Sequence, residues 1–398
     1  MLFDPASHEP LTDRPWSVSR AQEAIRAIAE DAEAAYDPDA LWPAHPRDLE
    51  GGPLPAVASL YLGASGVICA LDELARAGVV APRRDWAPVA AGLHERYLAS
   101  PDFPENTGGG TVPSMWMGEA GILLVAHRLA PQRAQEDRLL ECVRVNAANP
   151  TWELMWGSPG TMLAARAMHD RTGDARWAQA WRESADRLWD AWADPVWVQD
   201  LYGSRARYVG PAHGFAGNVL ALASGPLLDD GRRAELDRRV AAVVLATAQR
   251  EGELAQWPPT LDPPRRPGQP IRTQWCHGAP GIVASLGRVG AGDAAFGEVL
   301  LAGGELTWRT GPLAKGPGLC HGTAGNGYAL LKLFERTGDE AWLARARAFA
   351  MHAAEQVERE RAAHGRGRFS LWTGDVGVAL YLASCLAATA DVPTLDRL

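Results

Sequence analysis

Apolar residues gather in seven runs along the chain, and each run begins with the pattern Gly-x-x-Gly. The first glycines of these patterns are Gly63, Gly118, Gly157, Gly214, Gly278, Gly322 and Gly374. The patterns recur roughly every 40 to 65 residues, which leaves enough chain in each repeat for two helices and their connections. After Gly118 and Gly157 the following residues are apolar on nearly all sides of the expected helix. Such helices are predicted to be buried.

Between these runs lie segments that carry a single apolar stripe. In one of them the stripe consists of Trp177, Trp181, Ala185, Leu188 and Trp192. Charged residues occupy the opposite side of the same segment. This pattern predicts amphipathic helices that cover the buried ones.

The string Arg-Thr-Gly-Asp precedes two of the amphipathic segments, at residues 171–174 and 336–339. In both places the glycine is expected to end a buried helix, because glycine adopts the left-handed conformation found at helix ends. The aspartate is expected to cap the helix that follows. The repeated string therefore predicts a common register for the repeats.

Seven buried helices that alternate with seven amphipathic ones favour an all-α fold, the α/α toroid, built as a double ring. An open solenoid is the alternative, but the polar end repeats typical of solenoids are not obvious. Because the glycine patterns run from Gly63 to Gly377 without a linker, residues 51–398 are interpreted as one toroid domain. Residues 1–50 are expected to form an N-terminal helical segment that packs on it. The proline-rich stretch 257–270 is interpreted as a loop over the functional site.

Composition and charge exclude some classes of partner. The net charge is −9 and 47% of the residues are hydrophobic, without the basic stripe that nucleic acid requires. The N-terminal residues lack the basic start and apolar core of a signal peptide, and no apolar run approaches the roughly 20 residues of a membrane span. The protein is therefore expected to be cytoplasmic, with neither a nucleic-acid partner nor a membrane span.

The five cysteines fall into two groups. Cys69, Cys142 and Cys385 lie in apolar helical segments and are expected to be core residues. Because the number of cysteines is odd and the chain is long, a disulfide framework is not expected. Cys276 and Cys320 differ from the other three, since each stands directly before a His-Gly pair that opens a Gly-x-x-Gly pattern.

These two cysteines predict a metal site. If the repeats close into a ring, the starts of the buried helices converge, so that Cys276, Cys320 and His321 can meet around one ion. Two thiolates and one imidazole are typical ligands of zinc, and three protein ligands leave one tetrahedral position open, as in catalytic sites. We expect one zinc ion per chain. The alternative is that the cysteines are buried and the histidines cap helices.

Other polar residues occupy comparable positions near the helix starts. His213 stands directly before Gly214, as His277 and His321 stand before their glycines, and can act as a general acid or base or be a hydrogen-bonded core residue. Arg272 lies four residues before Cys276, and Glu153 lies four before Gly157. Both are candidates for the site or ordinary surface charges. Lys315, in a glycine- and proline-rich loop before Cys320, can contact an anion or be solvated.

These residues resemble a known family, the lanthionine synthetase C-like proteins, which include bacterial lantibiotic cyclases and their animal relatives. The resemblance covers most of the chain through all seven glycine patterns. Its most specific strings are Trp275-Cys276-His277-Gly278-Ala279-Pro280-Gly281, Gly318-Leu319-Cys320-His321-Gly322-Thr323-Ala324-Gly325-Asn326, Ala212-His213-Gly214 and Phe369-Ser370-Leu371. The resemblance implies the α/α toroid and a zinc ion bound by Cys276, Cys320 and His321.

The same resemblance implies roles for further residues. His213, Arg272 and Glu153 match catalytic positions of the cyclases, although the acidic residue there is an aspartate. His277, where the peptide cyclases commonly have tyrosine, is more similar to the animal-type branch, which is associated with glutathione. Lys315 then matches a residue that contacts glutathione, and either Arg366 or Arg368 is expected to assist it.

The function implied by the resemblance is addition of a thiol to dehydroalanine or dehydrobutyrine, which forms a thioether. The acceptor would be a dehydrated peptide or protein, and the thiol either a peptide cysteine, which gives a lanthionine ring, or glutathione. Two alternatives stay open: a non-catalytic zinc- and glutathione-binding protein, and a carbohydrate-active enzyme on the same toroid. The sixteen tryptophans would suit sugar platforms, but sugar chemistry leaves the Cys-His pairs unexplained.

Overall fold

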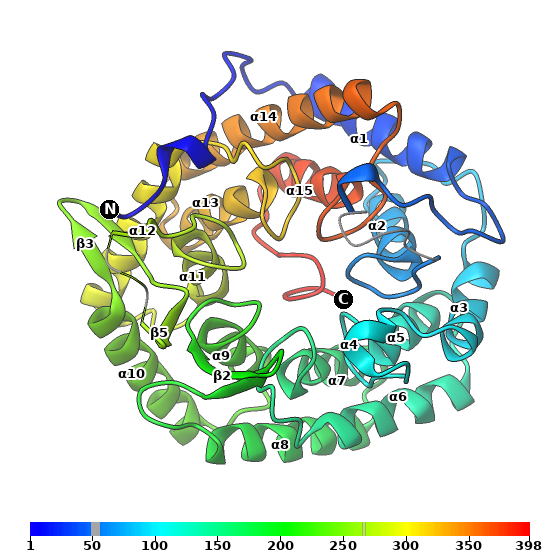
Figure 1. Cartoon of the computed structure of the whole chain (residues 1–398), viewed down its shortest axis with the longest axis horizontal. Helices are drawn as coiled ribbons and strands as arrows, with labels where there is room; N and C mark the ends of the chain where they lie inside the picture. The colour runs from blue at the N-terminus through cyan, green and yellow to red at the C-terminus, as the bar shows by residue number, and fades with distance from the viewer. Residues whose placement is uncertain (49–55, 265, 267) are drawn as a thin grey trace.

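The computed structural model describes residues 1–48, 56–264, 266 and 268–398. The domain boundary expected between residues 50 and 51 lies outside these described residues. Figure 1 shows two concentric rings of helices around a common axis, which confirms the predicted α/α toroid.

The inner ring is built from the seven predicted buried helices. They are α2 (Ala64–Arg76), α5 (Glu119–Leu129), α7 (Ser158–Thr172), α9 (Phe215–Ala223), α11 (Ala279–Leu286), α13 (Thr323–Thr337) and α15 (Asp375–Ala387). Each begins directly after the first glycine of a Gly-x-x-Gly pattern, which is its N-cap residue. The N-termini of all seven inner helices therefore derive from the same sequence signal.

The outer ring alternates with the inner one along the chain. Its helices are α1 (Val18–Ala34), α3 (Ala87–Ala99), α6 (Arg133–Asn146), α8 (Ala175–Asp190), α10 (Asp230–Thr247), α12 (Ala294–Thr310) and α14 (Glu340–His364). Helix α1, from the N-terminal segment, stands between α14 and α3 on the circumference and packs on α15 (Figure 1). The remaining helices are short: η1 (Pro5–Ser7), η2 (Pro46–Asp48) and α4 (Pro104–Thr107).

Five short strands, which the sequence patterns do not predict, interrupt the helical rings in the part of the chain that the structure describes. Strands β1 (Gln199–Leu201), β2 (Ser204–Tyr208) and β5 (Thr260–Asp262) form an antiparallel sheet in the order β1-β2-β5. Strands β3 (Gln249–Glu251) and β4 (Leu254–Gln256) form a separate hairpin. Strand β5 lies within the proline-rich stretch.

The predicted helix ends are confirmed at both Arg-Thr-Gly-Asp strings. Gly173 and Gly338 end α7 and α13 in the left-handed conformation, with φ of 68° and 69°. Asp174 and Asp339 then cap α8 and α14 with their side chains. The apolar stripe of α8 is buried as predicted, except that the helix ends at Asp190, before Trp192.

The second glycine of each pattern lets neighbouring repeats approach closely at the centre. At Gly66, an added Cβ would lie 2.2 Å from the carbonyl oxygen of Leu60 and 2.8 Å from the Cβ of Leu371. Leu371 belongs to the last repeat and Gly66 to the first, so this contact also closes the ring. A larger residue would force the two repeats apart.

A chain of backbone hydrogen bonds links the loops that precede the inner helices. The N–H of Cys276 donates to the carbonyl of Cys320 (3.1 Å), and the N–H of Cys320 donates to Trp372 (2.8 Å). The N–H of Trp372 in turn donates to Tyr61 (3.2 Å), and that of Tyr61 to Trp116 (3.0 Å). All five residues stand two positions before the first glycine of their patterns. The bond from Trp372 to Tyr61 joins the last repeat to the first.

The C-terminal segment crosses the opposite end of the ring, near the C-termini of the inner helices. Asp396 forms ion pairs with Arg288 (2.9 Å) and with the buried Lys332 (3.0 Å), and Arg166 donates to its carbonyl (3.1 Å). Thr394 is fully buried and accepts a hydrogen bond from the indole of Trp372 (3.2 Å). Figure 1 shows this segment in the middle of the ring.

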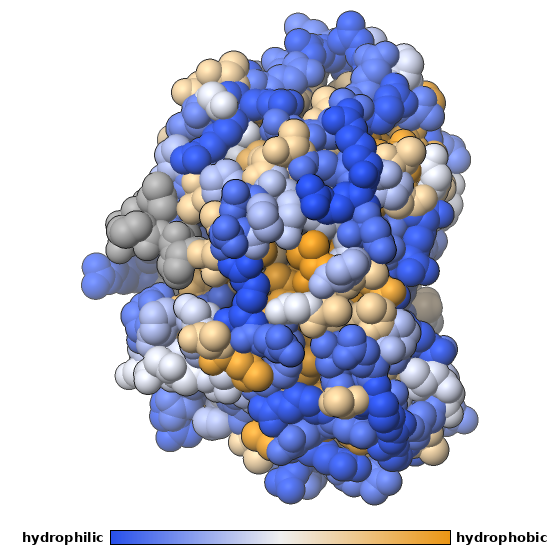
Figure 2. Space-filling model, turned by 90° about the vertical axis from the view of Figure 1, so that its right-hand side faces the viewer, coloured by the Kyte–Doolittle hydropathy of each residue, from blue (hydrophilic) through white to orange (hydrophobic). Residues whose placement is uncertain are grey.

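The outer surface agrees with an amphipathic outer ring. The face on the α3 side is mainly hydrophilic, with apolar residues visible in a central recess (Figure 2). Among the described residues, no helix combines the length and the apolarity needed to cross a membrane.

We predict that Gly66→Ala lowers the free energy of unfolding by about 1–3 kcal/mol, because the added methyl group collides with Leu60 and Leu371. Gly92→Ala is the matched control: Gly92 lies within α3, and no atom lies within 4 Å of an added Cβ. That control is expected to stabilise by roughly 0.5–1 kcal/mol, because alanine favours a helix interior. Urea unfolding of both variants checks the prediction, and equal effects would contradict it.

Candidate metal centre and active site

Cys276, Cys320 and His321 come together at the inner-helix N-termini. One candidate ligand atom from each residue lies within 4.8 Å of the other two. Both cysteines are buried, and His321 is partly exposed. The structure thus brings together the three residues that the sequence predicts as metal ligands, and the group can hold a metal ion.

Backbone geometry explains why these three residues meet. The hydrogen bond from Cys276 to Cys320 fixes the two loops side by side. Gly278 has a φ of 99°, and an added Cβ would lie 2.2 Å from the carbonyl oxygen of Arg272. Because a side chain is strained at this φ, glycine is needed for the turn that leads from Cys276 into α11.

The two thiols differ in acidity. The hydrogen bond from Cys320 lowers the pKa of Cys276 well below its ordinary value, although burial opposes this, and interactions with the imidazoles of His277 and His321 lower it further. The pKa of Cys320 is raised, first by its bond to Cys276 and then by burial. The pair therefore favours a thiolate at Cys276, which accepts a hydrogen bond from the protonated thiol of Cys320.

Two further residues contact these sulfur atoms. The side-chain amide of Gln274 donates to the Sγ of Cys276 at 2.9 Å. The Tyr61 hydroxyl hydrogen-bonds Cys320; burial first, and then the negative charge of Cys320, raise the pKa of that phenol. Polar donors next to both sulfurs stabilise negative charge on them.

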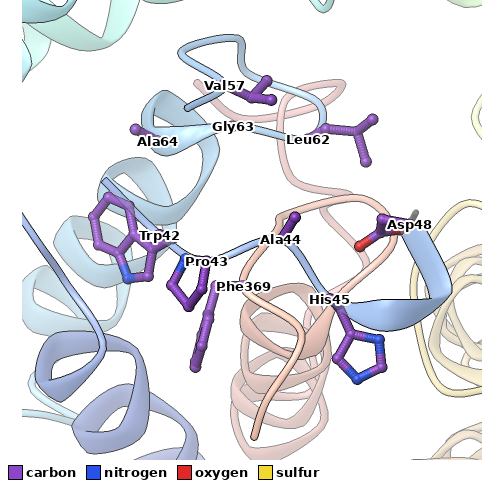
Figure 3. A pocket seen from close by; sticks show the side chains of 10 residues that line it. All are labelled: Trp42, Pro43, Ala44, His45, Asp48, Val57, Leu62, Gly63, Ala64 and Phe369. Atoms are coloured by element: carbon purple, nitrogen blue, oxygen red, sulfur yellow. The ribbon is translucent and has the colours of Figure 1, made fainter. Parts of the chain in front are cut away.

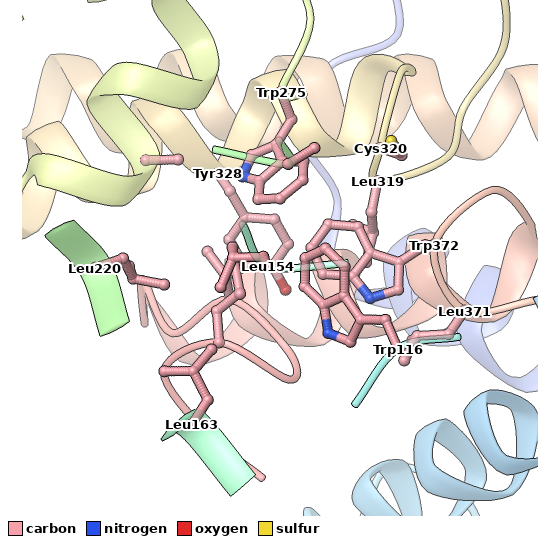
Figure 4. Close-up of a cluster of buried hydrophobic side chains, with 14 of the residues drawn as sticks. Trp116, Leu154, Leu163, Leu220, Trp275, Leu319, Cys320, Tyr328, Leu371 and Trp372 are labelled. Atoms are coloured by element: carbon pink, nitrogen blue, oxygen red, sulfur yellow. The ribbon is translucent and has the colours of Figure 1, made fainter. Parts of the chain in front are cut away.

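A cluster of buried aromatic side chains lies close to Cys320 (Figure 4). The ring centroid of Trp372 lies 4.5 Å from those of Trp116 and Trp275, and all three side chains are fully buried. Tyr61 stacks on Trp372 at 6.1 Å. These three tryptophans are buried beside the site, so they do not serve as the exposed platforms that sugar binding requires.

His213 and Glu153 form a pair beside the cysteines. The Nδ1 of His213 lies 3.0 Å from the Oε2 of Glu153, a fully buried carboxylate that also accepts the backbone N–H groups of Met155 (2.9 Å) and Trp156 (2.6 Å). Burial alone would lower the pKa of His213, but the hydrogen bond and the charge of Glu153 raise it above the ordinary value. His213 is thereby kept available as a proton donor near neutral pH.

A cavity of about 650 Å³ lies on the other side of Gln274, whose side chain contacts Cys276. Its lining comes from three segments, residues 4–8, 269–274 and 313–315, and includes both Arg272 and Lys315. Both of these cations are exposed, while Gln274 connects the cavity wall to Cys276. The structure thus brings Arg272 and Lys315 together in one cavity, where they outnumber the single carboxylate of Asp4, and the excess of positive charge suits an anionic ligand.

Arg368 does not line this cavity. Its side chain is held by Asp48, with 3.0 Å between Nε and Oδ1. Asp48 lines a smaller cavity of about 40 Å³ between residues 42–48 and the start of α2, bordered by Phe369 (Figure 3). Arg368 is therefore held by a residue of a different cavity from the one that Arg272 and Lys315 line. Arg366, the other expected arginine, is partly exposed and does not line the cavity of Arg272 and Lys315 either.

Sequence reasoning missed Tyr61, Gln274 and the contact between His213 and Glu153. Tyr61 stands two residues before Gly63, as Cys320 stands before Gly322, so aligning all seven repeats would have identified it. Gln274 carries no comparable signal. The cysteines expected in the core, Cys69, Cys142 and Cys385, are buried free thiols, and burial raises the pKa of each to about 12.

Two known proteins from an animal and a plant are similar in sequence to parts of this chain. A zebrafish (Danio rerio) protein named glutathione S-transferase LANCL1 is 33% identical over 195 residues, which cover 48% of this chain and 46% of that protein. The Arabidopsis thaliana LanC-like protein GCL1 is 42% identical over 82 residues, or 20% of this chain and 19% of the relative. These matches span half or less of the relatives' own lengths. The animal match agrees with the expected likeness to the animal-type branch.

The solved structure of nisin cyclase has a similar fold. It aligns with a TM-score of 0.60 at 16% identity, and covers 92% of this chain and 93% of the cyclase. Residues 55–396 match the family described as lanthionine synthetase C-like protein. Because this match covers most of the sequence, the chain belongs to the lanthionine synthetase C-like family.

Proposed function

We propose that this protein catalyses zinc-dependent addition of a thiol to a dehydroalanine or dehydrobutyrine residue, which forms a thioether. The observation that carries the proposal is the meeting of Cys276, Cys320 and His321 beside the His213–Glu153 pair. A metal-ligand group, a proton donor and a cationic cavity lie at one end of the ring. Free thiols at this site would suit a reducing, cytoplasmic setting.

The ligand group fits zinc. Two thiolates and an imidazole within 4.8 Å of one another are a donor set that zinc prefers, and a fourth tetrahedral position would be open to substrate. When bound, the ion would supply positive charge that lowers the pKa of a coordinating thiol. Gln274 and Tyr61 would keep the protein sulfurs in place through their hydrogen bonds.

Side chains of the protein would supply the proton for the addition and stabilise the negative charge that develops during it. The substrate sulfur forms a bond to the β-carbon, and the electron pair of the C=C bond moves toward the acceptor carbonyl. Arg272 would stabilise the negative charge that develops on that oxygen. His213 would deliver a proton to the α-carbon, while Glu153 keeps its imidazole oriented and protonated. The thiol proton leaves to solvent, from which His213 is recharged.

We further propose glutathione as the thiol, because Lys315 gives the cavity a positive charge that suits one of its carboxylates. The zebrafish relative's name, glutathione S-transferase, supports this choice. A peptide cysteine on the acceptor itself is the second candidate, supported by the fold shared with nisin cyclase. The acceptor in either case would be a dehydrated peptide or protein.

One assay tests the proposal and separates these thiols. The purified protein is offered a dehydroalanine peptide with an internal cysteine, and separately a cysteine-free dehydroalanine peptide with glutathione, and products are analysed by mass spectrometry. A glutathione adduct supports glutathione transfer. Loss of the free thiol without a mass change indicates cyclisation. Bound zinc and glutathione without either product would reject catalysis in favour of a binding protein.

We expect the wild-type protein to bind one zinc ion per chain. We predict that the variants Cys276→Ala and Cys320→Ala each lose most of this zinc, because the two remaining ligands hold the ion poorly. Cys142→Ala is the control, since it removes a buried thiol in α6, outside the ligand group. Metal analysis of the dialysed proteins checks this. Full zinc content in both ligand variants would reject the site.

We predict that His213→Ala lowers kcat by about 10²–10⁴-fold, the usual contribution of a general acid, and leaves the zinc content unchanged. Glu153→Gln removes the charge that raises the pKa of His213. Because the protonated imidazole is the active form, the decline of kcat with rising pH should then begin at a lower pH. Thermal melting of both variants monitors folding, and an unshifted pH profile would contradict the pairing.

We predict that Lys315→Ala raises the KM for glutathione by roughly tenfold, because it removes one charge-assisted contact. The KM for an uncharged thiol such as 2-mercaptoethanol and the zinc content should not change. Arg309→Ala, which removes an exposed arginine paired with Glu305 on α12, is the control. An equal rise for both thiols after Lys315→Ala would reject an electrostatic role for Lys315.

A further inference from the structure

The hairpin of β1 and β2 projects an aromatic residue beside His213. Its two-residue turn consists of Tyr202 and Gly203, with φ of 52° and 72°. Such turns favour asparagine, aspartate or glycine at both positions, because other side chains are strained at positive φ. A tyrosine at the first position is therefore unfavourable for the turn itself.

Burial does not compensate for this strain. The Tyr202 side chain is 61% exposed, one of the few large hydrophobic residues so open to solvent among those described. Strained residues that gain little from packing are found at functional sites more often than elsewhere. The conformation of Tyr202 thus calls for an explanation other than stability.

The hairpin is fixed to the loop that precedes α7. The side chain of Gln199 donates to the carbonyl of Trp152 (3.3 Å) and accepts the N–H of Tyr208 (2.9 Å). The N–H of Asp200 donates to the carbonyl of Pro150 (3.2 Å). The loop that holds Glu153 thereby also holds the hairpin, so that Tyr202 has a defined position relative to His213.

The Tyr202 ring is oriented from two sides. Its hydroxyl accepts a hydrogen bond from the indole of Trp156 at 2.9 Å. Its ring meets that of His213 edge-on, with centroids 6.0 Å apart and planes at 79°. The ring of Tyr208 lies at the same distance from His213, at 55°. The fixed hydroxyl and the exposed ring together make a platform at the side of the proposed proton donor.

A polar atom nearby is also without a protein partner. The Nδ1 of His277 is buried and has no hydrogen-bond partner among the described residues, and its ring centroid lies 6.3 Å from that of His213. Buried polar atoms are normally satisfied. A substrate amide beside His213 can provide the missing partner.

We propose that Tyr202 determines specificity for the acceptor, by stacking on the planar, conjugated amide of a dehydroamino-acid residue so that its α-carbon faces His213. This inference rests on the proposed function and deepens it. The thiol would enter from the cavity of Arg272 and Lys315, and the acceptor from the side of the β1–β2 hairpin. The platform carries no charge, which suits a neutral conjugated amide.

Two substitutions of Tyr202 distinguish the effect of its aromatic ring on acceptor binding from its effect on the turn. Tyr202→Asn removes the ring but introduces a residue that the turn favours, so the hairpin should be retained. Tyr202→Phe keeps the ring and loses only the hydroxyl. With N-acetyldehydroalanine methylamide as acceptor and glutathione as thiol, Tyr202→Asn should raise the acceptor KM roughly tenfold, whereas Tyr202→Phe should change it little. The glutathione KM and the zinc content should stay unchanged in both.

Leu98→Ala is the matched control, because it truncates an exposed apolar side chain on α3. Binding of the same acceptor is measured in parallel by ligand-observed NMR, which needs no turnover. An unchanged acceptor KM and unchanged binding in Tyr202→Asn, with its melting temperature maintained, would overturn the inference. If the wild type binds the acceptor without converting it, the proposed reaction is rejected. Weaker binding of the acceptor by Tyr202→Asn would then still support the role of Tyr202, and unchanged binding would reject it. If the wild type neither binds nor converts it, both proposals fall.

Discussion

The hydrogen-bonded backbone at the centre of the ring is the constraint on which the other features depend. From Cys276 through Cys320, Trp372 and Tyr61 to Trp116, each N–H donates to a carbonyl in the next repeat. These bonds form only if the repeats approach closely, which the second glycine of each Gly-x-x-Gly pattern allows. Because the chain of bonds includes the last and first repeats, it joins two parts of the sequence about 300 residues apart. Closure of the fold and the position of the cysteines thus have one cause.

The same arrangement creates an unusual local electrostatic environment. Seven inner helices begin at one end of the ring, so the partial positive charges of their N-termini face the same region. Of the two sulfur atoms placed just before these helices, that of Cys276 is favoured as the thiolate. Trp372 and its aromatic neighbours exclude water from one side of the site, which strengthens the interactions of the charges beside them. Burial also organises the His213–Glu153 pair, because the buried carboxylate of Glu153 orients the imidazole of His213 and stabilises its positive charge.

Much of this could be predicted from the sequence, because the signals are local. The Gly-x-x-Gly patterns predicted every inner helix, and Asp174 and Asp339 predicted the start of two outer ones. Cys276, Cys320 and His321 could be grouped because they share a register within the repeats. Contacts between distant segments left no such signal: His213 and Glu153 are 60 residues apart, and the Asp48 that holds Arg368 is 320 residues from it. The short strands follow from pairing between loops rather than from the periodicity of any one segment.

The C-terminal segment, which crosses the far end of the ring, affects whether a polypeptide could pass through the ring. With Thr394 buried against Trp372, and Asp396 held by Arg288 and Lys332, the ring resembles a cup more than a tunnel. Under the proposed function, a polypeptide acceptor that reached the inner-helix N-termini would have to leave by the side from which it entered. Successive modifications of one polypeptide would then require repeated docking, and their order would be set by which residue reaches the bottom of the cup.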